Sequence, residues 1–287
     1  GIEAVLKPNL THEQLLECIK DYDAMIIRST TTVTADILEA ASNLKVIGRA
    51  GVGVDNVDVD TATRLGILVT NTPTSNTISA AEHTITLMLA LSRNVPQADA
   101  SLKSGIWNRS EFVGVELYNK TLGIVGLGRI GNEVVKRVKA FDMKVIAYDP
   151  YISQEGADKI GVKLLSFEEV LSKSDYISLH VPYIPETHHL IGKKEFDLMK
   201  PCTRLINCAR GGIIDENALY EALKNNKLSG AALDVFVNEP VTDCPLFELD
   251  NVVVTPHLGA ATEEAQPNVA VEIAQQVVNA LRGKPVA

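Results

Sequence analysis

The sequence contains little cysteine and no long apolar run. Only four cysteines occur among its 287 residues, and no two of them form a Cys-x-x-Cys pair. So few thiols exclude a disulfide-rich secreted scaffold and favour reduced cysteines in a cytoplasmic protein. The longest clear apolar run, residues 84–91, is far shorter than the roughly 18 residues of a membrane-spanning helix. We therefore predict a cytoplasmic location and no membrane partner.

Positive charge is scarce as well. The chain carries 27 Lys and Arg against 36 Asp and Glu, a formal net charge of −9 at pH 7, and it has no basic stripe. This balance excludes nucleic acid as a partner. An anionic substrate could bind only where a local group of arginines reverses the field. The content of 46% hydrophobic and 22% charged residues is that of a globular protein, and the length suits about two domains.

Short apolar runs alternate with helical patterns, which is typical of parallel sheets with helices on both faces. The first third of the chain predicts strands at residues 3–6, 24–27, 45–47 and 67–69. Six further strands are predicted at residues 121–125, 144–148, 176–179, 204–207, 231–235 and 252–255. Six strands with crossover helices make a full dinucleotide-binding sheet. The fold class predicted is therefore α/β, with two doubly wound parallel-sheet domains.

Helical patterns fill the intervals between these strands. An apolar helix is predicted at residues 79–91, followed by a polar stretch, 97–113, that holds the only tryptophan and suggests an arm or an interface. A later helix is predicted at residues 215–226, with Asp215 as its N-cap. The last helical pattern, 262–281, contains Pro267, so we expect this helix to begin near Gln266 with the proline in its first position.

A glycine-rich turn is the strongest local motif. Gly126, Gly128 and Gly131 form G-x-G-x-x-G directly after the strand at 121–125 and before a helix. The first glycine permits a tight turn, the second lets the backbone approach a pyrophosphate, and the third lets helix and strand pack closely. The N–H groups of Arg129 and Ile130 then open the helix and can bind the phosphates. This context predicts a dinucleotide site.

Asp149 supplies the acidic partner that such a site needs. It ends the next strand, 18 residues after Gly131. A carboxylate there accepts hydrogen bonds from the adenosine ribose, and it would repel the 2′-phosphate of NADP. No arginine follows closely, so the predicted cofactor is NAD.

Three later strands are each followed by an unusual polar residue. Arg210, Glu239 and His257 lie just past the ends of the strands at 204–207, 231–235 and 252–255. Because ligands bind outside the carboxyl ends of parallel strands, we expect the three side chains to converge. Arginine suits a substrate carboxylate, histidine suits proton transfer, and a glutamate beside the histidine stabilises the imidazolium.

These segments together resemble one known family. The sequences GLGRIG, NCARGGIIDE, DVFVNEP and TPHLGAAT resemble the D-2-hydroxyacid dehydrogenases, and GRAGVGVDNVD at 48–58 narrows the resemblance to the phosphoglycerate dehydrogenases within that family. The resemblance covers nearly the whole chain. It implies a Rossmann NAD-binding domain at 73–262, inserted in a flavodoxin-like substrate domain formed by 1–72 and 263–287.

The resemblance also implies roles for individual residues. His257 would be the catalytic acid/base, Glu239 its partner and Arg210 the anchor of the substrate carboxylate. Cofactor contacts are implied at Val52, Gly126, Gly128, Arg129, Ile130, Gly131, Asp149, Val181, Cys208, Ala209, Arg210, Asp234, His257, Gly259 and Ala260. Contacts to a phosphorylated 2-hydroxy or 2-oxo acid are implied at Arg28, Arg49, Ala50, Gly51 and Asn76, with Arg109 reaching in from the other subunit of a homodimer.

Two other functions remain open on the sequence alone. One is a different D-2-hydroxyacid dehydrogenase, such as a glyoxylate or hydroxypyruvate reductase. The other is a binding protein similar to the NAD(H)-responsive corepressors of this fold. His188 and His189 are adjacent rather than at ligand spacing, so no metal site is predicted. His83, on the apolar helix, is expected to serve packing or an interface.

One feature departs from the family pattern. The family's first strand–helix unit has no counterpart ahead of Gly1. In a flavodoxin-like sheet of order 2-1-3-4-5 that first strand is central. We therefore expect the chain to be part of a longer protein.

Overall fold

The chain folds into two compact units. The computed structural model describes residues 1–286. The smaller unit is Gly1–Asn76 together with the segment that begins at Ala260, and the larger unit is Thr77–Gly259. These limits differ by only a few residues from the domain limits predicted from the sequence. The assignment of one unit to the cofactor and the other to the substrate stays a prediction.

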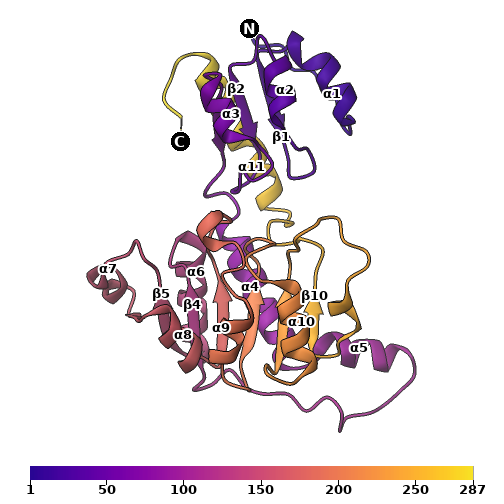
Figure 1. Cartoon of the computed structure of the whole chain (residues 1–287), viewed down its shortest axis with the longest axis vertical. Coiled ribbons are helices and arrows are strands. Elements are labelled where there is room, and N and C mark those ends of the chain that lie inside the picture. The colour runs from indigo at the N-terminus through magenta and orange to yellow at the C-terminus, as the bar shows by residue number, and fades with distance from the viewer. Residues whose placement is uncertain (287) are drawn as a thin grey trace. The chain divides into compact units, whose positions relative to one another are not determined.

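A seven-stranded parallel sheet forms the larger unit (Figure 1). Its strands are β4 (Thr121–Val125), β5 (Lys144–Tyr148), β6 (Lys163–Leu164), β7 (Tyr176–Leu179), β8 (Arg204–Asn207), β9 (Gly230–Leu233) and β10 (Val252–Val254). Their order is β10-β9-β8-β7-β4-β5-β6. The chain therefore runs outward from β4 in both directions, and the switch point lies between β4 and β7. The sequence predicted all of these strands except β6, whose two residues are too few to leave a periodic pattern.

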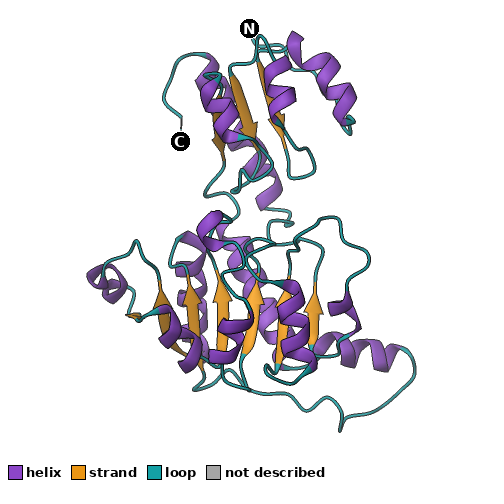
Figure 2. Ribbon diagram, in the orientation of Figure 1, coloured by secondary structure: helices purple, strands orange, loops and turns teal. Residues whose placement is uncertain are grey.

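Helices cover both faces of this sheet (Figure 2). On one face, α8 (Phe167–Lys173), α9 (Lys193–Leu198) and α10 (Glu216–Lys224) pack on a core that includes Phe196 and Leu219. On the other face, α4 (Thr77–Ser92) and α6 (Arg129–Val138) pack on a core that includes Met88 and Val134. The remaining helices are α5 (Val95–Lys103) and α7 (Gln154–Lys159). Asp215 caps α10 by accepting hydrogen bonds from two backbone N–H groups of the first turn, as predicted.

The smaller unit contains three parallel strands in the order β1-β2-β3. They are β1 (Ala24–Ile27), β2 (Val46–Arg49) and β3 (Leu68–Asn71), and the helices around them are α1 (His12–Cys18), α2 (Ala35–Ala40), α3 (Val59–Arg64) and α11 (Ala265–Leu281). Gly48 lets α11 lie close to β2, because a Cβ atom there would come within 2.5 Å of Val277 Cγ2. The segment after residue 260 is thus an integral part of this unit.

One predicted strand is absent from the structure. Residues 3–6 have no regular structure, and Leu6 is 90% exposed. In the order 2-1-3-4-5 this segment would pair only with a strand that precedes it in sequence, and residues 1–286 contain no such strand. The prediction failed because an apolar run needs a neighbouring strand to complete its hydrogen bonds.

The last helix begins slightly earlier than predicted. Pro267 is the third residue of α11, not the first. The first four N–H groups of a helix have no partner within the helix, so a proline in the first turn costs no hydrogen bond. None of the helices in residues 1–286 is both long and apolar enough to cross a bilayer.

Candidate active site

The glycine loop follows β4 at the switch point of the larger sheet. Gly126 has a φ of +93°, and a Cβ atom there would lie 2.6 Å from the carbonyl oxygen of His180, at the end of β7. A Cβ atom at Gly131 would lie 2.4 Å from the carbonyl oxygen of Gly126. These two glycines are therefore required by the loop's own packing.

Gly128 is different, because the fold itself leaves room for a side chain there. A Cβ atom at this position would meet nothing within 4 Å. Gly128 is the residue that precedes α6, so the N–H groups of Arg129 and Ile130 belong to the first turn, at the positive end of the helix, and have no partner within it. A phosphate group fits such a position, and a side chain would obstruct it. The loop therefore fits a pyrophosphate.

Asp149 is held against this loop. Its Oδ2 atom accepts a hydrogen bond of 2.7 Å from the N–H of Leu127, and its Oδ1 atom accepts one of 2.8 Å from the N–H of Tyr151. The carboxylate is thus fixed beside the glycine turn, at the end of β5. Each oxygen has a further lone pair, which can accept a ribose hydroxyl. The geometry fits the adenosine half of NAD.

The end of β7 supplies the other side of the switch point. Val181 packs against the glycine loop, because its Cγ1 atom would lie 2.9 Å from a Cβ atom at Gly126. The ring of His180 makes a hydrogen bond of 2.9 Å with Ser178. Burial lowers the pKa of His180 to about 4, so the imidazole is neutral at pH 7 and offers no positive charge to a phosphate. Sequence reasoning missed His180, although its place directly after a central strand was a signal.

Arg210 lies on the loop after β8. Asn207 shapes this loop, because its side chain donates to the carbonyl of Arg210 at 2.8 Å and accepts from the N–H of Ala209 at 3.0 Å. A Cβ atom at Gly211 would come within 1.9 Å of the carbonyl oxygen of Phe236. The loop that carries Arg210 therefore lies directly against the loop after β9.

Glu239 and His257 are in direct contact. Oε2 of Glu239 lies 2.6 Å from Nδ1 of His257, while Oε1 accepts a hydrogen bond of 3.0 Å from the N–H of Phe236. Burial alone would raise the pKa of Glu239, but these two hydrogen bonds hold it below its usual range. The carboxylate is therefore ionised at pH 7 and fixed on the imidazole. The two side chains are 33% and 38% exposed, so a substrate can reach them.

Asp234 is almost completely buried beside this pair. Its carboxylate accepts hydrogen bonds from the side chains of His83 and Thr255 and from the N–H groups of Leu258 and Gly259. Burial opposes ionisation, yet these bonds hold the pKa of Asp234 below its usual range. His83 was expected to serve packing or an interface, and the structure instead places its ring on the Asp234 carboxylate. No local sequence signal marked this contact.

Cys208 lies next to the Arg210 loop. Burial raises the pKa of its thiol to about 12, so it is protonated at neutral pH and is not a nucleophile. It packs on the apolar core under α4, and the Ala209 that follows it is held by Asn207. This environment is that of a small packing residue, and the cofactor contact implied for Cys208 stays a prediction.

In the smaller unit, Arg28 directly follows β1, and Arg49 is the last residue of the neighbouring strand β2. Asn56 ties their loops together by donating to the carbonyl of Arg28 at 2.9 Å and accepting a bond of 3.4 Å from Nε of Arg49. The guanidinium of Arg49 lies over Gly51, where a Cβ atom would be 1.6 Å from Nη1. Arg28 itself donates to the side-chain oxygen of Gln266. The two predicted substrate residues thus lie at the carboxyl ends of neighbouring strands of the small sheet. Asn56 links them, and the sequence analysis did not identify this residue.

The other predicted residues of this unit lie nearby in the chain. The N–H of Ala50 donates to the carbonyl of Ile27, and the carbonyl of Val52 accepts from Asn71. The side-chain oxygen of Asn76 has no hydrogen-bond partner within residues 1–286. The carbonyl of Ala260 accepts from Gln266. The contacts of these residues with a cofactor or a substrate stay a prediction.

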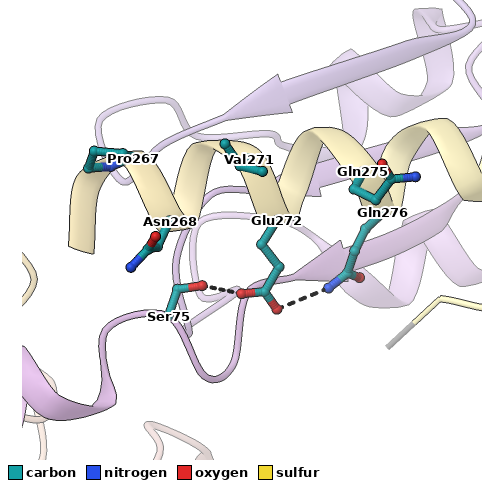
Figure 3. Close-up of a pocket in the computed structure, with 7 residues that line it drawn as sticks. All are labelled: Ser75, Pro267, Asn268, Val271, Glu272, Gln275 and Gln276. Atoms are coloured by element: carbon teal, nitrogen blue, oxygen red, sulfur yellow. Dashed lines mark hydrogen bonds between the residues drawn. The ribbon is translucent and has the colours of Figure 1, made fainter. Parts of the chain in front are cut away.

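A groove of about 500 Å³ along α11 contains none of the predicted site residues (Figure 3). Within it, Ser75 donates a hydrogen bond to Glu272, whose other oxygen accepts from Gln276 at 3.4 Å. Ser75, Glu272 and Gln276 are thus engaged with one another, and we assign no chemistry to this groove.

The polar arm of the larger unit is exposed. Arg109 lies on its surface, and the neighbouring Ile106, Trp107 and Val113 are 58%, 77% and 79% exposed. Exposed apolar side chains of this size are typical of a surface that a partner covers.

Within residues 1–286, no group of three or more His, Cys, Asp or Glu side chains is arranged to hold a metal ion.

Comparison with known proteins gives consistent matches. Residues 85–259 match the family described as D-isomer specific 2-hydroxyacid dehydrogenase, NAD binding domain. The D-3-phosphoglycerate dehydrogenases of Methanocaldococcus jannaschii and Archaeoglobus fulgidus are 56% and 53% identical over 98% and 100% of this chain. The chain spans about half the length of these relatives, 54% of each.

A solved structure shows the same fold. The D-lactate dehydrogenase of Aquifex aeolicus, complexed with NAD and lactic acid, superposes with a TM-score of 0.86 at 35% identity. The match covers 93% of this chain and 85% of that one.

Proposed function

Because this chain belongs to the D-isomer specific 2-hydroxyacid dehydrogenase family, we propose that it oxidises 3-phosphoglycerate to 3-phosphohydroxypyruvate with NAD, the first step of serine biosynthesis. The observation that carries this proposal is the 2.6 Å contact of His257 with Glu239, at the carboxyl end of a dinucleotide-binding sheet. The identity with D-3-phosphoglycerate dehydrogenases over nearly the whole chain supports the choice of substrate.

Proton transfer is the task of His257. Because Nδ1 donates to Glu239, Nε2 is the basic atom that takes the proton of the substrate 2-hydroxyl. Glu239 stabilises the imidazolium that results. In the reductive direction the same imidazolium returns its proton to the 2-oxo oxygen. NAD, held by the N–H groups of Arg129 and Ile130 and by Asp149, would supply the acceptor for the hydride of C2.

Cofactor binding is the task of the switch point between β4 and β7. The N–H groups of Arg129 and Ile130 bind the pyrophosphate at the open position of Gly128. Asp149 accepts hydrogen bonds from the ribose and disfavours a 2′-phosphate by charge repulsion. We propose that residues 73–262 form the NAD-binding domain and the rest the substrate domain.

Substrate binding requires local positive charge, because the net charge of −9 would repel a phosphorylated acid. Arg210 would bind the carboxylate through its planar guanidinium. Arg28 and Arg49, whose loops are joined by Asn56, would bind the phosphate end. We further propose a cytoplasmic homodimer in which the exposed arm brings Arg109 to the partner's site.

The deciding experiment compares NADH oxidation with 3-phosphohydroxypyruvate, hydroxypyruvate and glyoxylate at equal concentrations. We expect kcat/KM to be highest for 3-phosphohydroxypyruvate. A preference for hydroxypyruvate or glyoxylate would identify a reductase of unphosphorylated acids instead. NADH binding without turnover of any of the three would favour the corepressor-like alternative.

A further inference from the structure

His83 is a partly buried titratable residue that the proposed chemistry does not use. It lies on α4, which packs against β9 and β10, and its side chain is only 16% exposed. Its Nε2 atom lies 3.1 Å from Oδ1 of Asp234 and 3.0 Å from Oγ1 of Thr255. A carboxylate only accepts hydrogen bonds, so Nε2 carries a proton and donates to Asp234. We refer to His83, Asp234 and Thr255 as the anchor cluster.

The anchor cluster holds the loop that carries His257. The hydroxyl of Thr255 donates to Oδ1 of Asp234 at 2.5 Å. The same carboxylate accepts the N–H groups of Leu258 at 2.7 Å and Gly259 at 2.9 Å. The carbonyl of Asp234 accepts the N–H of His257 itself at 2.9 Å. Asp234 therefore binds the loop before, at and after His257.

The backbone of His257 needs such support. Its φ of +55° places it in the left-handed region, which is unfavourable for a residue with a Cβ atom. A strained conformation persists only where the surroundings over-determine it. Four hydrogen bonds from residues 255–259 to Asp234 hold His257 in this left-handed conformation. His83 supplies a further donor to Asp234, and it comes from outside the loop.

We propose that His83 is a positioning residue. Its imidazole fixes the Asp234 carboxylate, and Asp234 in turn holds residues 255–259 so that the ring of His257 meets Glu239 and presents Nε2 to the substrate. The role of His257 as the acid/base rests on the proposed function, whereas the hydrogen-bond chain that holds it does not.

The first test is kinetic. His83→Leu keeps the approximate shape but removes the donor, so we expect kcat to fall by roughly ten- to a hundredfold, the loss that a displaced catalytic group causes. KM for NADH and for the 2-oxo acid should change by less than about threefold. The reason is that the anchor cluster positions His257 for proton transfer and does not contribute to the binding of the ground state. His83→Gln, which can place an amide donor near the position of Nε2, should recover most of kcat.

A matched control is available in the smaller unit. Nε2 of His12 lies 2.8 Å from Oδ2 of Asp36, so His12→Leu removes a similar histidine–aspartate contact far from this loop in sequence. Its kcat should equal that of the unaltered protein. The high-pH limb of the reductive kcat/KM profile should move to lower pH in His83→Leu and not in His12→Leu, since only the former loosens His257 from Glu239.

A second test does not depend on turnover. A proton in a charge-assisted bond as short as 2.6 Å resonates far downfield, so the Nδ1 proton of His257 can be observed in ¹⁵N-histidine-labelled protein. We expect this signal in the unaltered protein, in His12→Leu and in His83→Gln. It should broaden or vanish in His83→Leu and in Thr255→Val, which removes the hydroxyl donor to Asp234.

The outcomes separate this proposal from the proposed function. If kcat and the His257 signal are unchanged in both His83→Leu and Thr255→Val, His83 only fills space and the proposal is wrong. If His83→Leu does not fold, Thr255→Val and His83→Gln decide the matter. If the unaltered protein reduces no 2-oxo acid yet its His257 signal depends on His83, the positioning role stands and the proposed function falls.

Discussion

Nδ1 of His257 lies 2.6 Å from Oε2 of Glu239, although 18 residues separate the two in sequence and each follows a different strand. The contact exists because β9 and β10 are neighbours in a parallel sheet, so that the loops after them meet at one edge. It fixes the orientation of the imidazole and the charge beside it, and it makes the pH dependence of the reaction testable.

Replacing Glu239 by Gln should move the high-pH limb of the reductive kcat/KM profile, where activity falls as His257 loses its proton, to lower pH. The imidazolium of His257 loses its anionic partner, so a higher proton concentration is needed to keep it charged. The measurement is kcat/KM for the 2-oxo acid between pH 5 and 9. Glu239→Asp retains the charge and serves as the control. A profile that is identical in Glu239→Gln would contradict the assigned pairing.

Replacing Asp149 should narrow the preference for NADH over NADPH. Asp149→Asn keeps a hydrogen-bond acceptor for the N–H of Leu127 but removes the charge that repels a 2′-phosphate. We expect the dissociation constant of NADPH divided by that of NADH to fall by about tenfold, which is the effect of one charged contact. Both constants are measured by titration of nicotinamide fluorescence. Asp158→Asn, on the exposed surface of α7, is the control. Equal binding of both cofactors by the unaltered protein would rule out this role.

His180 should make the protein less stable as the pH falls from about 6.5 toward 4. Its pKa in the folded protein is about 4, below the value of about 6.5 for an unfolded chain. In that window the unfolded state binds a proton that the folded state excludes, so the free energy of unfolding falls with decreasing pH by up to ~1.4 kcal/mol per pH unit.

The test of His180 has two parts. Its imidazole titration should be followed by NMR, and urea unfolding should be compared for the unaltered protein and His180→Leu between pH 4 and 8. The variant should show a smaller loss of stability at low pH. A titration midpoint near 6.5 would show that burial does not control this residue.

Replacing Arg49 by Ala should raise KM for 3-phosphohydroxypyruvate by roughly tenfold to a hundredfold, the worth of one charge-assisted contact. KM for unphosphorylated hydroxypyruvate should change much less. Arg64→Ala, an exposed arginine of the same unit that pairs with Glu39, should affect neither substrate. Equal losses for both substrates would mean that Arg49 supports the loop over Gly51 or the carboxylate end instead.

The exposed arm should mediate a homodimer. Trp107 is 77% exposed, so Trp107→Ser should weaken self-association while leaving the fold unchanged. Sedimentation velocity at micromolar concentration measures both proteins. If the unaltered protein is a fully active monomer under those conditions, the predicted dimer and the predicted contribution of Arg109 from a second subunit are both wrong.

Features that depend on neighbours in sequence could be predicted from the sequence alone. The glycine loop is one, because the turn, the helix N-terminus and the strand before it are consecutive. The Asp215 cap is another, since its hydrogen bonds reach only the next turn. Asp149 and the strand-end positions of Arg210, Glu239 and His257 followed from the same reasoning, because a strand pattern also predicts where the strand ends.

Features that join distant segments were decided by the tertiary structure. His83 and Asp234 are 151 residues apart, and a histidine on an apolar helix carries no mark of the carboxylate it will contact. Asn56 gave no sign that it would tie Arg28 to Arg49, and residues 3–6 looked like a strand although no strand in residues 1–286 pairs with them. The physical reason is common to all three. A periodic pattern reports local conformation, whereas a hydrogen bond between remote residues exists only once the chain has brought them together.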